Sequence, residues 1–203
     1  MLRKCASVGR SDIAASLRGL VHVDMAYQRP LDEFTFLSMT MLQGVHGGQD
    51  SSDVAVLLRG LGQVSSARGR LDESTCWLGQ SLVMLRRIHG DKDHSEVVAT
   101  LNSLAHVYMA QGRLDESASL HEESLAMYRR IHGSKDHSDV AATLNSLAHV
   151  HMAQGRLDES VSRHEESLAM YRRIHGSKDH SDVAASLCSL AQVYMAQGRL
   201  DES

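Results

Sequence analysis

The chain has 203 residues, of which 42% are hydrophobic, 23% charged and 4% aromatic, and its net charge at pH 7 is −4. An acidic chain with few aromatic side chains is not expected to bind nucleic acid, because such binders usually carry a basic surplus and, for single strands, aromatic stacking platforms. No apolar run approaches the roughly 18 residues that predict a membrane-spanning helix, so no membrane span is expected.

Residues 1–10 are predicted to be a short tail. They carry Arg3 and Lys4 but no apolar stretch afterwards, so they do not have the pattern of a signal peptide. The three cysteines, Cys5, Cys76 and Cys188, lie far apart and are odd in number. They form neither a disulfide framework nor a paired zinc motif, which favours a reducing compartment and a cytoplasmic location.

An internal repeat of 43 residues organises the rest of the chain. Residues 101–143 and 144–186 are identical except at four positions, and Gly-Arg-Leu-Asp-Glu-Ser begins at Gly69, Gly112, Gly155 and Gly198. A self-similarity of this length is typical of a solenoid built from stacked units. The period predicts a degenerate repeat 1 over 11–51, repeat 2 over 52–94, repeat 3 over 95–137, repeat 4 over 138–180 and a partial repeat 5 over 181–203.

Each repeat is predicted to form two antiparallel helices, as the third copy shows. Ser95 is a good N-cap residue, and Glu96 lies in the first turn, where the helix dipole favours an anion. Gly112 is expected to end this helix in a left-handed conformation, and residues 114–116 begin the second helix. Apolar side chains recur on one face of the first helix at Val97, Leu101, Leu104, Ala105 and Tyr108.

The second helix of the third copy ends with Arg129 and Arg130 before Gly133, so its terminal charges also suit the helix dipole. Neither helix can bury its apolar face alone, so the units must stack into an all-α solenoid of tandem helix pairs. The apolar or small positions of this second helix are Leu114, Ser117, Leu120, Ser124, Leu125 and Tyr128.

These residues resemble the tetratricopeptide repeat family, in particular the long repeat of kinesin light chains and relatives such as nephrocystin-3. The resemblance covers about residues 11–203 and is carried in the third copy by residues 101–105, Tyr108, residues 111–117 and the Asp136-His137 step. It implies a right-handed superhelix whose first helices line a concave groove for partner proteins. It also implies, by analogy, a kinesin heavy chain or a motor cargo as partner.

The chain departs from the family pattern in three respects. Serine follows the Asp-His step where the family has proline, and the loop is one residue longer; a serine N-cap can still begin the helix. Serines also replace small alanines of the second helix, where they keep the close approach of the helices and can bond their own backbone. Residues 1–10 are too short for the heptad region that joins kinesin light chains to the motor, so a motor-attached role rests on the resemblance alone.

The last repeat ends four residues into its second helix. This leaves the predicted inner face of the preceding helix without a partner helix: Leu187, Leu190, Ala191 and Tyr194. Two explanations are open, since solenoid ends normally need a cap. Either the sequence is a fragment of a longer chain, or another chain, such as a second copy, covers this face.

A polar row opposite the buried positions of the first helices is the candidate binding site. Its carboxamides can donate to and accept from the backbone of an extended peptide, and its arginines and histidines favour an acidic ligand. An exposed solenoid face must be polar even without a ligand, so that interpretation also stays open. The row consists of Arg18, His22, Arg59, Gln63, Asn102, His106, Asn145, His149 and Gln192, with Met25, Met109, Met152 and Met195 as an adaptable apolar floor.

The sequence predicts neither a metal site nor a catalytic site. Histidine pairs in the inter-repeat loops lack the three or four converging ligands of a zinc site, so no metal or other cofactor is expected. No loop has the lysine and hydroxyl of a phosphate cradle, and no cysteine or acid pair has the partner that catalysis needs. The loop pairs are His89 and His94, His132 and His137, and His175 and His180, each beside an aspartate.

The sequence therefore predicts a non-enzymatic adaptor or scaffold that binds a protein or peptide ligand. A regulatory or sensor array detached from a multidomain enzyme or nucleotide-binding signalling protein is an alternative, and a purely structural spacer is another. Charge reversal at Arg18 and Arg59 without loss of a partner would favour the spacer.

Overall fold

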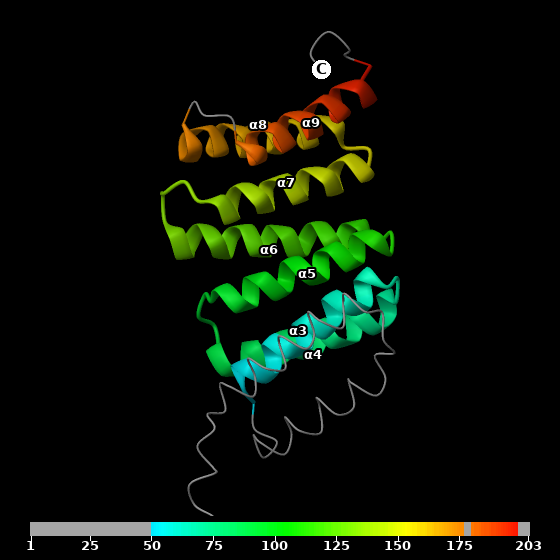
Figure 1. Cartoon of the computed structure of the whole chain (residues 1–203), viewed down its shortest axis with the longest axis vertical. Coiled ribbons are helices and arrows are strands. Elements are labelled where there is room, and N and C mark those ends of the chain that lie inside the picture. The colour runs from blue at the N-terminus through cyan, green and yellow to red at the C-terminus, as the bar shows by residue number, and fades with distance from the viewer. Residues whose placement is uncertain (1–49, 177–179, 199–203) are drawn as a thin grey trace, which may run out of the picture. The chain divides into compact units, whose positions relative to one another are not determined.

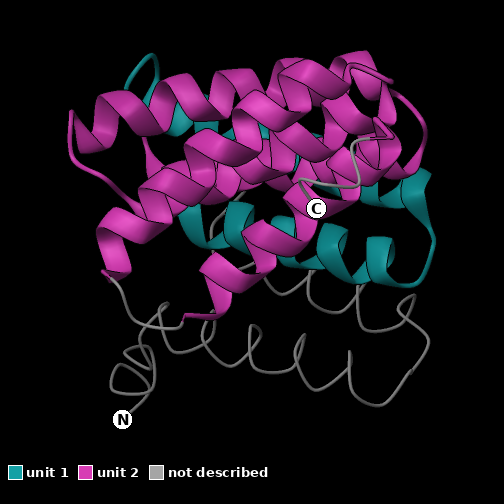
Figure 2. Cartoon of the chain, turned by 90° about the horizontal axis from the view of Figure 1, so that it is seen from above, with its two compact units in different colours: residues 1–92 teal, residues 93–203 magenta. Residues whose placement is uncertain are grey.

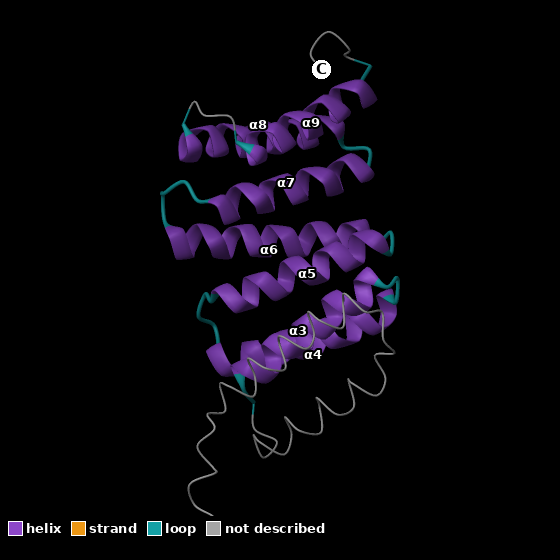
Figure 3. Cartoon of the chain, viewed as in Figure 1, coloured by secondary structure: helices purple, strands orange, loops and turns teal. Residues whose placement is uncertain are grey.

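Every regular element in the described part of the computed structural model is an α-helix (Figure 1, Figure 3). The described residues are 50–176 and 180–198. The groove candidates Arg18 and His22, with Met25 of the apolar floor, lie outside them. The helices are α3 (Ser52–Ala67), α4 (Leu71–His89), α5 (Ser95–Ala110), α6 (Leu114–His132), α7 (Ser138–Ala153), α8 (Leu157–His175) and α9 (Ser181–Ala196).

The chain divides into two compact units, residues 1–92 and residues 93–203, which Figure 2 colours separately. In the first unit α3 packs on α4. In the second unit each helix from α5 to α9 packs on the next one along the chain. The prediction of an all-α fold of tandem helix pairs is confirmed; the boundaries given above for the repeats stay a prediction.

In the second unit the first helix of each repeat, α5, α7 or α9, is capped by histidine. Nδ1 of His94, His137 and His180 accepts a hydrogen bond from the backbone N–H two residues later, at 3.2 to 3.3 Å. The prediction that Ser95 is the N-cap was wrong, because Ser95 is the first helical residue and His94 holds the extended cap conformation, with φ −141° and ψ 135°. An imidazole lone pair reaches a free amide of the first turn as a hydroxyl would.

The predicted helix ends are confirmed at the glycines. Gly112 has φ +75°, the left-handed region in which a residue without Cβ is unstrained. The turn is closed by a hydrogen bond from Arg113 N–H to Tyr108 C=O at 2.9 Å, which satisfies one of the last carbonyls of α5. Gly133, with φ +65°, ends α6.

The core follows the predicted periodicity with one exception in α5. Tyr108 is half-buried, and the Arg113 guanidinium lies 3.9 Å from the centre of its ring, whereas Val98 and Val107 are buried instead. The remaining four predicted positions of α5 are buried: Val97, Leu101, Leu104 and Ala105. In the second unit one cluster contains Val98, Ala118, Leu125, Tyr128, Val140, Leu144, Leu147 and Val150.

Buried serines connect the two helices of a pair. Ser117 Oγ donates to Ala105 C=O at 2.8 Å, and Ser160 Oγ donates to Ala148 C=O at the same distance. Both serines are fully buried. The prediction that such serines bond their own backbone was wrong, because the partner helix comes close enough for its carbonyl to accept. The small serine side chain therefore both allows the close approach and supplies a hydrogen bond across it.

Candidate functional site

In the second unit the polar row lies on α5, α7 and α9, and the carboxamides of Asn102 and Asn145 are engaged by buried histidines. Asn102 Oδ1 lies 3.1 Å from His121 Nδ1, and Asn145 Oδ1 lies 2.6 Å from His164 Nδ1. Each histidine belongs to the second helix of the same pair and is 0% exposed. Each amide oxygen is therefore held inside the protein and is not a free acceptor for a peptide.

Sequence reasoning missed these two histidines, although a signal was present. His121 lies four residues after the small Ser117 and four before the apolar Leu125, so it shares their buried face at helical spacing. Histidine is neither apolar nor small, so a pattern of apolar and small residues does not select it. His164 occupies the same position in the next pair.

The side-chain amides of Asn102 and Asn145 differ in the hydrogen bonds that their Nδ2 atoms make. Asn102 Nδ2 donates to Thr143 Oγ1 at 3.4 Å, and Thr143 in turn donates to Asp139 C=O at 2.8 Å. The counterpart of Thr143 is Ser186, and Asn145 Nδ2 makes no hydrogen bond with any residue that the structure describes. Asn102 and Asn145 therefore offer amide N–H donors to a ligand, and those of Asn145 are the freer.

His106 of the row is less basic than a free imidazole. Burial lowers the pKa of His106, and the neighbouring charge that His149 can carry lowers it further. The ring of His106 therefore carries less positive charge near neutral pH than its sequence position suggested. Gln192 lies exposed on α9, Met195 is 60% exposed, and in the first unit Arg59 is half-buried.

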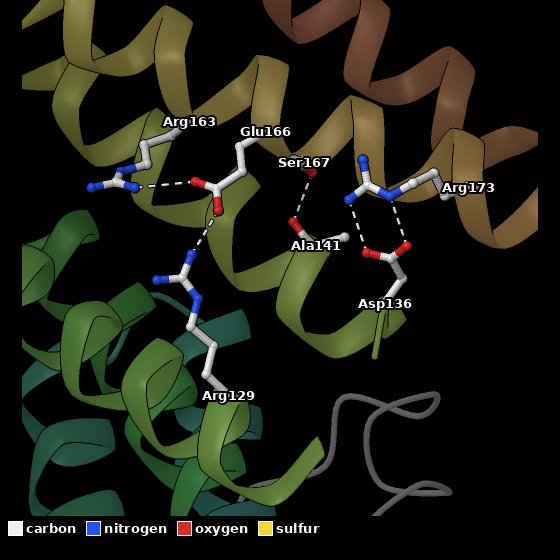
Figure 4. A network of polar contacts seen from close by, with 7 residues as sticks. All are labelled: Arg129, Asp136, Ala141, Arg163, Glu166, Ser167 and Arg173. Atoms are coloured by element: carbon white, nitrogen blue, oxygen red, sulfur yellow. Dashed lines mark hydrogen bonds and ion pairs between the residues drawn. The ribbon is translucent and has the colours of Figure 1, made fainter. Parts of the chain in front are cut away.

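The structure brings the loop histidines together with an aspartate that sequence reasoning did not select. His132, His137 and Asp139 place potential ligand atoms within 4.8 Å of one another. The same holds for His175, His180 and Asp182. Asp136 is the aspartate that directly precedes His137 in the sequence. It does not join this cluster but accepts two hydrogen bonds from Arg173, at 2.7 and 2.8 Å (Figure 4).

The geometry of these loop clusters does not suit a metal ion. The rings of His132 and His137 are stacked at 3.6 Å between centroids with 9° between their planes. Imidazole lone pairs lie in the ring plane, so stacked rings direct them side by side rather than toward one ion. The Nδ1 of His137 is also occupied, because it caps α7, and a helix N-terminus disfavours a cation.

Of the paired acids of α8, Glu166 makes surface ion pairs (Figure 4). Glu166 accepts from Arg129 at 2.6 Å and from Arg163 at 3.1 Å, and Glu165 accepts from the Tyr194 hydroxyl at 3.1 Å. Cys76 is exposed on α4. None of the described helices has the length and apolar character needed to cross a membrane.

The family comparisons agree with this architecture. Family profiles described as tetratricopeptide repeat match residues 97–139 and 139–203. No curated protein matches the sequence.

Solved structures give the same fold at low sequence identity. BtubC (BKLC) from P. vanneervenii is 19% identical with a TM-score of 0.83, over 98% of this chain and 80% of that one. A putative kinesin light chain from P. anserina with nearly identical TPR-like repeats is 21% identical with a TM-score of 0.77, over 93% and 88%. The N-terminal domain of stress-induced protein-1 from C. elegans is 16% identical with a TM-score of 0.51, over 68% and 95%.

Proposed function

The chain belongs to the tetratricopeptide repeat family, and from this premise we propose that it is a non-enzymatic adaptor that binds an extended segment of a partner protein along its polar row. The observation that carries the proposal is the Asn145 amide, whose oxygen is fixed by His164 while its N–H groups stay available. An amide donor can bond the main-chain carbonyl of a peptide without reading the peptide's sequence.

Preorganisation supports the same proposal. The 2.6 Å contact to His164 fixes the orientation of the Asn145 amide before any ligand arrives. A side chain that is already ordered loses little conformational entropy on binding, so more of its hydrogen-bond energy contributes to affinity. Exposed neighbours such as Gln192 and Met195 add adaptable contacts around it.

The charge and the class of the partner can be inferred, but not its sequence. Arg59 supplies a permanent positive charge in the row of the first unit, which favours an acidic segment. The structural similarity to putative kinesin light chains supports a motor cargo or a kinesin heavy chain as the class of partner. The widely spaced cysteines, with Cys76 and Cys188 free and exposed, favour the cytoplasm as the site of action.

An amide-to-acid exchange tests the groove most sharply. The variant Asn102→Asp plus Asn145→Asp keeps an oxygen that can accept from His121 and His164, and removes the N–H donors. The matched control is Ser119→Ala plus Ser162→Ala, which changes two exposed positions of the second helices. Both variants and the intact chain are used as bait in a proximity or pull-down screen, with helical circular dichroism checked first.

We expect the aspartate variant to lose partners that the control variant retains. Retention of every partner by a well-folded aspartate variant would show that binding does not use the amide donors. A chain that captures no partner reproducibly in any form would favour the spacer interpretation.

A further inference from the structure

The first helices of the second unit carry histidine as their sole source of positive side-chain charge. The helices α5, α7 and α9 contain neither lysine nor arginine, and the one acid of each helix lies in its first turn. On the polar row of these helices, the groups that can become cationic are His106 and His149. This part of the row can therefore offer a countercharge to an acidic side chain only through an imidazole.

The two imidazoles stand one repeat apart, between uncharged residues at the same position of the repeat. That position is Gln63 in α3 and Gln192 in α9. Glutamine matches imidazole in offering a donor and an acceptor, but it carries no charge. One helical turn before each histidine, on the same face, lies the amide of Asn102 or Asn145. The helices α5 and α7 thus each offer an amide donor for a peptide main chain and, beside it, a titratable ring.

Each of these rings packs against a buried imidazole. The ring of His106 meets that of His121 edge to face, with 5.1 Å between the centres and 74° between the planes. His149 meets His164 in the same way, at 4.9 Å and 83°. One side of the His106 ring therefore lies on protein although the residue is exposed, and His149 is half-buried. The contacts order both rings, so holding an anion costs them little side-chain entropy.

The charges that act on the two rings within the described residues belong to other imidazoles. His106 interacts with His121 on α6 and with His149 on α7. His149 interacts in turn with His164 on α8. Burial and then the charge of His149 lower the pKa of His106, so protonation of this ring is disfavoured in the free protein. A carboxylate beside the rings opposes this effect, because an opposite charge favours the protonated imidazole.

We propose that His106 and His149 form a proton-linked subsite for a carboxylate side chain of the bound partner: the acid binds together with a proton, which one of the two imidazoles takes up. This inference rests on the proposed peptide binding and adds to it a position and a pH dependence. A group whose pKa is higher in the complex takes up protons as the complex forms, so the affinity for an acidic segment rises as the pH falls. A segment with a neutral side chain at this position gains nothing from acidification.

Peptide titration at two pH values tests the subsite. The probes are a blocked oligo-glutamate peptide and, as its uncharged match, a blocked oligo-glutamine peptide. The ordinary pKa of glutamate is about 4.3, so its side chains stay largely ionised at both pH 7.5 and pH 5.5. Isothermal titration calorimetry of the full chain, in buffers of different ionisation enthalpy, gives the affinity and the number of protons taken up.

The test variant is His106→Gln plus His149→Gln. It gives α5 and α7 the residue that α3 and α9 already have at this position, so it is expected to fold, and circular dichroism checks this first. The matched control, His132→Gln plus His175→Gln, removes the same number of histidines from the inter-repeat loops.

We expect oligo-glutamate to bind the wild type and the loop control at least about tenfold more tightly at pH 5.5 than at pH 7.5, which corresponds to an uptake of about half a proton per peptide. The test variant should lose this gain, and oligo-glutamine should show none. An equal gain in the test variant, an equal gain with oligo-glutamine, or no binding of oligo-glutamate at either pH would overturn the proposal.

The same data separate this subsite from the proposed function. Binding of both peptides that does not change with pH would overturn the subsite and leave the amide-based function standing. Proton-linked binding of oligo-glutamate, together with retention of every partner by the aspartate variant, would support the subsite and contradict the amide-based function.

Discussion

Repeats 3 and 4 (95–137 and 138–180) are nearly identical in sequence, yet the same residue has different partners in the two. Ser167 is buried and donates to Ala141 C=O at 2.7 Å, whereas its counterpart Ser124 is buried with no partner for its hydroxyl. The carbonyl that would accept from Ser124 belongs to Val98, which stands where repeat 4 has Ala141. The larger side chain of Val98 accompanies the loss of this bond in repeat 3.

Further differences accompany the substitutions Tyr108/His151 and Thr143/Ser186. Tyr108 is half-buried beneath Arg113, while its counterpart His151 is buried and contacts Gln154 at 3.2 Å. Thr143 receives a hydrogen bond from the Asn102 amide. A tandem repeat thus fixes the backbone of each unit, while side-chain partners depend on single substitutions within the unit and in the unit next to it.

The largest expected effect is shared by both repeats. Leu144 and its counterpart Leu101 are both 0% exposed. Replacing either with alanine should lower the free energy of unfolding by about 2–5 kcal/mol through lost apolar contact and a residual cavity. Urea unfolding followed by circular dichroism measures both. Losses that differ by more than about 1 kcal/mol would show that the two cores are not equivalent.

Acidification should destabilise both repeats through their buried histidines. Burial, followed by the charge of the adjacent His106 or His149, lowers the pKa from 6.5 to about 3 for His121 and to about 4 for His164. The unfolded chain therefore binds more protons than the folded one below pH 6.5, so this stability is full above that pH and falls as the pH drops toward 4.

A matched pair of glutamine variants separates the two contributions. His121→Gln and His164→Gln should each flatten the fall of melting temperature between pH 6.5 and pH 4. Parallel slopes in the wild-type chain and in both variants would contradict the burial argument.

The turn after α7 tests the helix end. Gly155 has φ +76°, and a Cβ placed there would meet nothing within 4 Å, so any cost of substitution is conformational rather than steric. Gly155→Val should destabilise by more than about 1 kcal/mol, because a β-branched residue resists positive φ. Gly155→Asn is the control and should cost less, since asparagine tolerates this region. Equal melting temperatures for the valine variant and the wild type would contradict the placement.

These features differ in how far the sequence predicts them. Periodicity located the buried face of α5 and glycine located its end, because both depend on local spacing and backbone conformation. His94 as a cap, Ser117 bonded across to Ala105, and the buried His121 were missed. Each depends on which group a neighbouring segment brings within reach, and propensity carries no information about that. For the polar row, the sequence predicts which residues belong to it but not that the amide oxygens of Asn102 and Asn145 already contact buried histidines.

The smallest expected effect addresses the serine comparison directly. Ser167→Ala removes a buried hydrogen bond and should cost about 0.5–1.5 kcal/mol, whereas Ser124→Ala removes an unsatisfied hydroxyl and should be neutral or slightly stabilising. If Val98 is the cause, Val98→Ala should make a subsequent Ser124→Ala as costly as Ser167→Ala. A double-mutant cycle on Val98 and Ser124, read by urea unfolding, measures this coupling. A coupling near zero would mean that Ser124 lacks its partner for a reason other than the valine, and that the helix spacing of repeat 3 is set elsewhere.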